Sequence, residues 1–199
     1  AVGLQGCSDD ENPMQPDGSI DLGSGDVGVL NYAYALEQLE AAYYIKVMES
    51  PYAGMSSDEM TILSEIRDHE IAHRDFFKAA IPAGSRIPDL EVNFSSVDFN
   101  SRISVLETAR AFEDLGVSAY NGAGYLLENE TYLGLAGKIV SVEARHASSI
   151  RDLLQPGTAY YAGDDVVVAG GLDVQRKPSE VLSIAGAYIS SNVTANNLP

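Results

Sequence analysis

Two of the three histidines in this chain follow a glutamate by three residues, as Glu70 with His73 and Glu143 with His146. Residues i and i+3 of an α-helix project from the same face, so a carboxylate and an imidazole at this spacing can bind one ion from a single helix. Each pair lies within an apolar pattern of helical period, which is typical of a core-facing side. The two pairs therefore predict a buried centre for two metal ions.

Two further glutamates, Glu37 and Glu113, complete this pattern as parts of an internal repeat. The segment that begins at Glu37 has leucine at its third position and tyrosine at its eighth, and so does the segment that begins at Glu113. Each segment is followed along the chain by one Glu-x-x-His motif. The sequence therefore contains two copies of one helical hairpin, and each copy supplies a Glu and a Glu-x-x-His.

The glutamates of both copies interrupt hydrophobic stripes, which predicts four carboxylates inside one core. A buried carboxylate must be protonated, paired with a positive charge or bound to metal, because its desolvation is otherwise too costly. The stripes carry no lysine, and Arg67, Arg110, Arg145 and Arg151 lie off the glutamate faces. Metal cations are therefore the simplest counter-charge. The predicted metal ligands are Glu37, Glu70, His73, Glu113, Glu143 and His146.

Two other ionisable residues near the motifs are predicted to lie outside the ligand set. Glu40 is one turn after Glu37, but its counterpart in the repeat is Gly116, which favours a surface position or a supporting role beside the ligands. His69 lies about 100° around the helix from Glu70 and has no counterpart in the repeat, so we expect a partly exposed surface histidine.

Tyr44 and Tyr120 each follow a predicted ligand by seven residues, two helical turns along the same face. One interpretation makes them catalytic residues, with a phenol that hydrogen-bonds to a ligand carboxylate, tunes it and supplies an electron. The other makes them large core side chains whose hydroxyl groups need a partner. Both interpretations stay open at this point.

These segments resemble the ferritin-like domain family that includes desiccation-related proteins. The resemblance covers about residues 26–190 and is carried by ALEQLEAAYY at 35–44, EIAHRDFF at 70–77, FEDLGVSAY at 112–120 and SVEARH at 141–146. It implies a four-helix bundle with a di-iron or di-manganese centre held by the six residues named above. The family label is largely structural, so it supports the metal centre better than any one reaction.

Helix signals agree with an all-α, ferritin-like four-helix bundle made of two helical hairpins. Ser56 and Glu59 form a capping box, and Asn129 can cap the last long helix. A link at 81–98 is long enough to cross the bundle. The predicted long helices are 26–49, 57–80, 101–127 and from 129 to about 154. The predicted regions are an extended acidic arm at 1–25, the bundle at 26–155, and an irregular tail at 156–199 with a strand-like stretch at 164–168 and a short helix from Pro178 to about Ile189.

The chain is strongly acidic, with a formal net charge of −17. This excludes nucleic acid as an expected partner, because phosphate binding requires a basic surface. The single cysteine, Cys7, follows Leu4, Gln5 and Gly6 in a pattern similar to the end of a bacterial lipoprotein signal. We expect membrane anchoring or an intermolecular disulfide through Cys7, a location outside the cytoplasm, and a homo-oligomer.

Three functions stay open. The first is an oxidoreductase whose two iron ions, bridged by Glu70 and Glu143, transfer electrons to O₂ or peroxide, because carboxylates are hard ligands that suit oxidised iron. The second is a di-manganese catalase with much the same ligands. The third is a secreted structural or desiccation-protective protein whose metal site is vestigial or only stabilises the bundle. The sequence has no Cys-x-x-Cys pair, so turnover would need electrons from another molecule.

Overall fold

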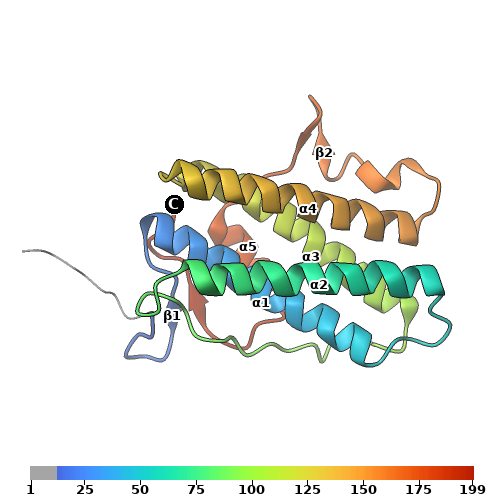
Figure 1. The fold of residues 1–199 in the computed structure, drawn as a ribbon, viewed down its shortest axis with the longest axis horizontal. Coiled ribbons are helices and arrows are strands. Elements are labelled where there is room, and N and C mark those ends of the chain that lie inside the picture. The colour runs from blue at the N-terminus through green and yellow to red at the C-terminus, as the bar shows by residue number, and fades with distance from the viewer. Residues whose placement is uncertain (1–12) are drawn as a thin grey trace, which may run out of the picture.

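The computed structural model describes residues 13–199, and four long α-helices make up most of it (Figure 1). The prediction of an all-α four-helix bundle is therefore confirmed. Cys7 lies outside the described residues. No helix within residues 13–199 is both long and apolar enough to span a membrane. The long helices are α1 (Gly25–Glu49), α2 (Ser57–Ala80), α3 (Arg102–Ala123) and α4 (Glu130–Leu154).

Side-chain caps set the starts of α2, α3 and α4. Ser56 accepts a hydrogen bond from the backbone N–H of Glu59, and the Glu59 carboxylate accepts one from the backbone N–H of Ser56, which completes the predicted capping box. Asn129 caps α4 by accepting hydrogen bonds from two backbone N–H groups of the first turn. The third helix ends earlier than predicted, because its last turn tightens into a 3₁₀ segment, η1 (Gly124–Leu126).

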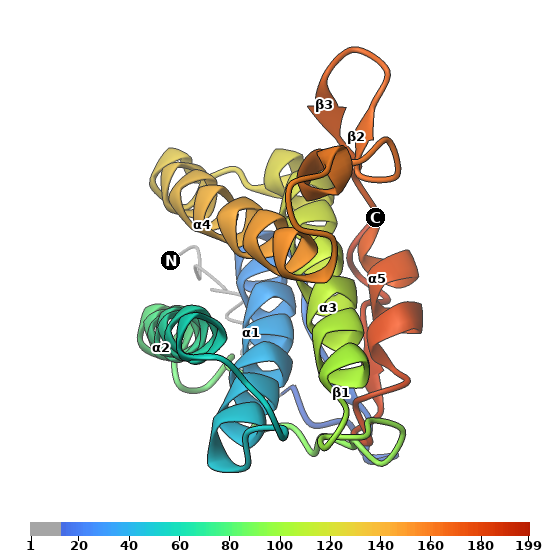
Figure 2. The same ribbon diagram turned by 90° about the vertical axis from the view of Figure 1, so that its right-hand side faces the viewer.

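The helices form two antiparallel hairpins, α1 with α2 and α3 with α4 (Figures 1 and 2). Residues 81–101 link the hairpins and run back along the length of the bundle, so α3 starts at the end where α1 finishes (Figure 1). As a result α1 and α3 lie side by side in opposite directions, as ferritin-like connectivity requires.

Helix α1 is buried around its whole circumference, whereas the sequence predicted only one apolar stripe. Every residue from Gly28 to Ala41 is buried. Two polar side chains on the side away from the ligands hold the link against α1. The Asn31 amide donates to the carbonyl of Ser85 and accepts from the N–H of Ile87, and Gln38 accepts from the N–H of Leu90. These bonds satisfy the polar groups that the link buries.

Both ends of the described chain meet in a small sheet. Strand β1 (Ile20–Asp21), which lies within the predicted arm, pairs in parallel with β4 (Val193–Thr194) near the other end. The predicted strand-like stretch contains β2 (Val167–Val168), which pairs with β3 (Leu172–Asp173) in a hairpin after η2 (Ala159–Ala162).

The last helix, α5 (Pro178–Ala185), packs on α3. It ends at Ala185 rather than near Ile189, because Ile189 pairs with Val92 of the link instead. The tail approaches α3 so closely that a side chain at Gly122 would collide with the carbonyl oxygen of Arg176. Glycine at this position is therefore required for the tail to dock.

Arg151 of α4 binds the part of the tail between η2 and β2 to the bundle. Its side chain is 1% exposed. The guanidinium donates two hydrogen bonds to Asp114 of α3, at 2.9 and 2.7 Å, and two to Asp165 of the tail, at 3.1 and 2.7 Å. The sequence placed Arg151 off the glutamate face, and the structure adds that its charge is neutralised by these two aspartates. It is therefore not a counter-charge for the central glutamates.

Replacing Arg151 should destabilise the fold more than replacing its partly exposed neighbour Arg110. Arg151→Met leaves Asp114 without its buried partner, which costs on the order of 3 kcal/mol of unfolding free energy. Arg110 also pairs with Asp114, but its side chain is 27% exposed, so Arg110→Met should cost less than about 1 kcal/mol. Urea denaturation of both variants measures the difference. Equal losses of unfolding free energy in the two variants would show that burial of the Arg151 ion pair adds nothing to stability.

Candidate metal centre

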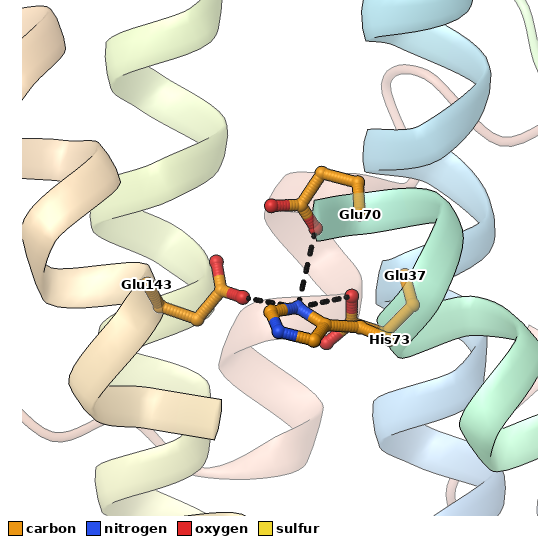
Figure 3. A group of neighbouring side chains, drawn as sticks. All are labelled: Glu37, Glu70, His73 and Glu143. Atoms are coloured by element: carbon orange, nitrogen blue, oxygen red, sulfur yellow. Dashed lines mark ion pairs between the residues drawn. The ribbon is translucent and has the colours of Figure 1, made fainter. Parts of the chain in front are cut away.

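All six predicted ligands converge in the middle of the bundle, and each long helix contributes. Glu37 comes from α1 and Glu113 from α3, while α2 and α4 each supply one Glu-x-x-His pair. The four glutamate side chains are fully buried, at 0% exposure. Figure 3 shows how three of these glutamates surround one of the imidazoles.

The six side chains form two groups that share two members. Within each group, one atom from every residue lies within 4.8 Å of the others. Because Glu70 and Glu143 belong to both groups, they are placed to bridge two ions, whereas Glu37 and Glu113 can each serve only one. The groups are Glu37, Glu70, His73 and Glu143, and Glu70, Glu113, Glu143 and His146.

The two groups have nearly the same geometry. Nδ1 of His73 lies 2.9 Å from Glu143, 3.5 Å from Glu37 and 3.8 Å from Glu70 (Figure 3). Nδ1 of His146 lies 2.9 Å from Glu70, 3.5 Å from Glu113 and 3.8 Å from Glu143. The sequence repeat therefore appears in space as an approximate two-fold relation between the two halves of the centre.

The unpaired atoms in the centre fit two metal ions. Eight of the buried side-chain atoms without a hydrogen-bond partner in the described residues lie in the centre: both carboxylate oxygens of Glu70 and Glu143, one oxygen each of Glu37 and Glu113, and Nδ1 of both histidines. They divide into four donors for each group. Buried polar atoms are normally satisfied, so a cluster of unpaired oxygen and nitrogen donors indicates a cation site. The arrangement is compatible with a di-metal centre, whose metal the donors alone do not specify.

The two tyrosines bind the carboxylate oxygens that face away from the centre. The hydroxyl of Tyr44 donates to Oε1 of Glu113, and that of Tyr120 donates to Oε1 of Glu37, both at 2.5 Å. Each tyrosine thus contacts the glutamate of the opposite repeat, which is possible because α1 and α3 run antiparallel. The hydrogen bonds give the hydroxyls the partners they need and leave the inner oxygens of both glutamates free for a cation.

Burial dominates the protonation of the carboxyl groups and phenols. It raises the pKa of Glu37, with the charge of Glu143 adding to the effect, and raises the pKa of Glu113 to about 7. Burial and then the neighbouring carboxylates also raise the pKa of Tyr44 and Tyr120 well above the usual value. Both phenols therefore stay protonated and remain hydrogen-bond donors at neutral pH.

For the imidazoles, the neighbouring carboxylates together affect the pKa more than burial does. Burial alone would lower the pKa of His73, but the carboxylates of Glu143, Glu37 and Glu70 raise it to about 12. The pKa of His146 is raised for the same reason. Burial alone would raise the pKa of Glu143, but the two imidazoles hold it at about 2. Without metal, protonated histidines thus supply the positive charge that the ions would otherwise bring.

Glu40 is buried, so of its two expected roles the surface position is wrong and a supporting role beside the ligands stays open. Its side chain is 3% exposed, and burial followed by the charges of the central glutamates raises its pKa well above the usual value. The repeat explains its location, because Glu40 fills the space left by the missing side chain at Gly116. A Cβ at Gly116 would lie 3.1 Å from Oε1 of Glu40. Glu40 belongs to neither group of candidate ligands.

His69 is exposed, as predicted, but it also contacts a candidate ligand. Its Nδ1 lies 2.9 Å from Nε2 of His146. No local sequence pattern predicts this contact, because the two residues are on different helices and His69 has no counterpart in the repeat.

Without metal, the protein should become less stable as pH rises from about 4.5 towards 8. Glu37, Glu40, Glu70 and Glu113 have raised pKa values when folded, so the unfolded chain loses their protons first and ionisation favours unfolding. The raised pKa of His73 acts in the same direction above its ordinary value of 6.5. The lowered pKa of Glu143 stabilises above 4.5, and this contribution disappears as pH falls towards 2.

Urea denaturation in the presence of a chelator, at several pH values, measures this dependence. Bound metal should reverse it, because the ions bind deprotonated ligands and their affinity rises with pH. A chelated protein whose stability increases between pH 4.5 and 8 would contradict these protonation states.

Comparison with known families agrees with the geometry. The ferritin-like domain family matches residues 25–156, which contain all four long helices and all six candidate ligands. No curated protein matches the chain. The family match covers more than half of the chain, and the structure supplies the four-helix bundle and the carboxylate and histidine cluster at its centre. The chain therefore belongs to the ferritin-like domain family.

Proposed function

We propose that this protein is a di-iron oxidoreductase that reduces O₂ or peroxide with electrons from an external donor. The observation that carries the proposal is the set of eight buried, unpaired ligand atoms, divided equally between two overlapping groups. An apolar core does not hold four glutamates at low cost unless cations neutralise them. Redox-active ions held there would supply electron transfer to a small oxidant.

The surrounding residues would prepare the centre for this chemistry. Tyr44 and Tyr120 donate to the outer oxygens of Glu113 and Glu37, which orients each carboxylate and draws charge away from it. Burial keeps water away from all four glutamates. Glu40, whose raised pKa keeps it protonated, would donate a proton to the reduced oxidant and become a carboxylate, which a proton from solvent would then neutralise again.

A small apolar pocket reaches Tyr120, whose hydroxyl binds a candidate ligand, and supports a small oxidant as the substrate. The pocket has a volume of about 30 Å³ and is lined by apolar side chains of all four long helices together with Tyr120, whose hydroxyl binds Glu37. That volume holds one or two water-sized molecules, so the pocket admits an oxidant as small as O₂.

Metal binding should depend on the two bridging glutamates. Wild-type protein should bind two ions per chain and gain about 2.7 kcal/mol of stability for each site whose free metal is at 100 times its dissociation constant. The double variant Glu70→Ala with Glu143→Ala should bind none, because both groups lose their shared ligands. Glu91→Gln, on the exposed link, should behave as wild type. Elemental analysis and thermal melting measure the effect. Unchanged metal content in the double variant would rule out this centre.

Iron oxidation tests the reaction. Protein loaded with Fe(II) without oxygen and then mixed with O₂ or peroxide should develop ferric absorbance rapidly. His73→Ala and His146→Ala should each reduce this rate at least about tenfold, because the imidazoles fix the ions in place. Stopped-flow absorbance measures the rate, and Glu91→Gln again serves as the control.

Other outcomes of this experiment identify the alternatives. Oxygen evolution from peroxide with manganese, but not with iron, would replace the proposal by a di-manganese catalase. Protein from its natural source that carries no transition metal, shows neither activity and forms ordered multimers would contradict an enzymatic role. The centre would then be a vestige in a structural or protective protein.

A further inference from the structure

His69 is the histidine outside the six candidate ligands, and its ring is aligned with that of His146. The two ring centroids are 5.2 Å apart and the ring planes differ by 8°. This centroid separation equals the 2.9 Å between Nδ1 of His69 and Nε2 of His146 plus the radii of the two rings. The rings therefore lie edge to edge in one plane, which points the N–H of one ring at the lone pair of the other.

The direction of this hydrogen bond follows from the position of His146. Its Nδ1 faces Glu70, Glu113 and Glu143 in the centre. A ring nitrogen that binds metal carries no proton, so the proton of a neutral, metal-bound His146 is on Nε2. Nε2 then donates to Nδ1 of His69, and the contact fixes both the orientation and the tautomer of His146.

His73 lacks an equivalent partner. His69 directly precedes Glu70. At the equivalent position of the other repeat, directly before Glu143, the residue is Val142, whose side chain has no hydrogen-bond acceptor. Val142 and His69 line the same groove between α2 and α4. No described residue hydrogen-bonds to Nε2 of His73, and the His73 side chain is 13% exposed against 6% for His146. The two imidazoles thus have matching contacts at Nδ1, which faces the centre, and different contacts at Nε2, which faces away from it.

We propose that His69 is a positioning residue that makes the two metal positions unequal, so that the position at His146 is filled first. The inference rests on the di-metal centre of the proposed function. A partner that accepts the outer N–H of a metal-binding histidine fixes its ring and raises its basicity, and loss of such a partner costs about 10–100-fold in metal affinity. At His73, in contrast, only the inner contacts with Glu37, Glu70 and Glu143 orient the ring.

Zinc titration followed by calorimetry and by NMR of the histidine rings tests this order without measuring activity. Wild-type protein should bind zinc in two steps of different affinity. The first equivalent should shift the ring resonances of His146 before those of His73. Long-range ¹H–¹⁵N spectra of the loaded protein should show His146 protonated on Nε2, and His69 protonated on Nε2 with Nδ1 as the acceptor.

Three variants separate positioning from a general structural effect. His69→Leu should weaken the first step about 10–100-fold and leave the second unchanged. His69→Asn should restore most of the loss, because its amide oxygen can take the place of Nδ1 as the acceptor. Val142→His should give His73 the missing partner and tighten the second step. His69 and Val142 are not fully buried, so these changes should leave the bundle folded.

Each result decides the inference. Unchanged binding steps in His69→Leu, or a His69 protonated on Nδ1 in the zinc-loaded protein, would overturn the role of His69 while leaving the di-metal centre intact. A wild-type protein that binds no zinc, iron or manganese would overturn both the proposed function and this inference.

Discussion

The fold is organised around the need to neutralise four carboxylates inside an apolar bundle. Glu37, Glu70, Glu113 and Glu143 are fully buried, and the nearest positive charge available from the chain is that of His73 and His146. Two protonated imidazoles balance only part of the negative charge, so the remaining carboxyls must hold protons when metal is absent. Arg151 does not neutralise the central glutamates, because its guanidinium is paired with Asp114 and Asp165. Helix packing and metal occupancy are therefore linked through one electrostatic constraint.

The two-fold relation between the hairpins supplies most of the centre, and its exceptions distinguish the two halves. Tyr44 and Tyr120 make reciprocal hydrogen bonds between α1 and α3, which requires those helices to be antiparallel and therefore requires the long link. The symmetry fails where Glu40 lies against Gly116, and again where His69 has Val142 as its counterpart. A centre built from a duplicated hairpin thus acquires different surroundings for its two ions through a few substitutions.

The sequence predicted the long helices and the convergence of the six candidate ligands because both depend on local spacing. Glu-x-x-His and the Ser56 capping box are decided within one helical turn. Features that depend on contacts between distant segments were missed. In the sequence, Asn31 and Gln38 look like ordinary helix residues, because their role depends on hydrogen bonds to the link. Glu40 is buried only because Gly116 leaves room for it on another helix. The contact of His69 with His146 similarly joins residues on α2 and α4.

The pairing of β1 with β4 has a consequence for how the chain folds during synthesis. It joins Ile20 to Val193, so this pair cannot form until nearly the whole described chain has left the ribosome. The helices that hold the candidate ligands are complete at Leu154, well before that point. The central cluster can therefore assemble and take up ions before β1 pairs with β4, and the two ends of the described chain then join an already formed bundle.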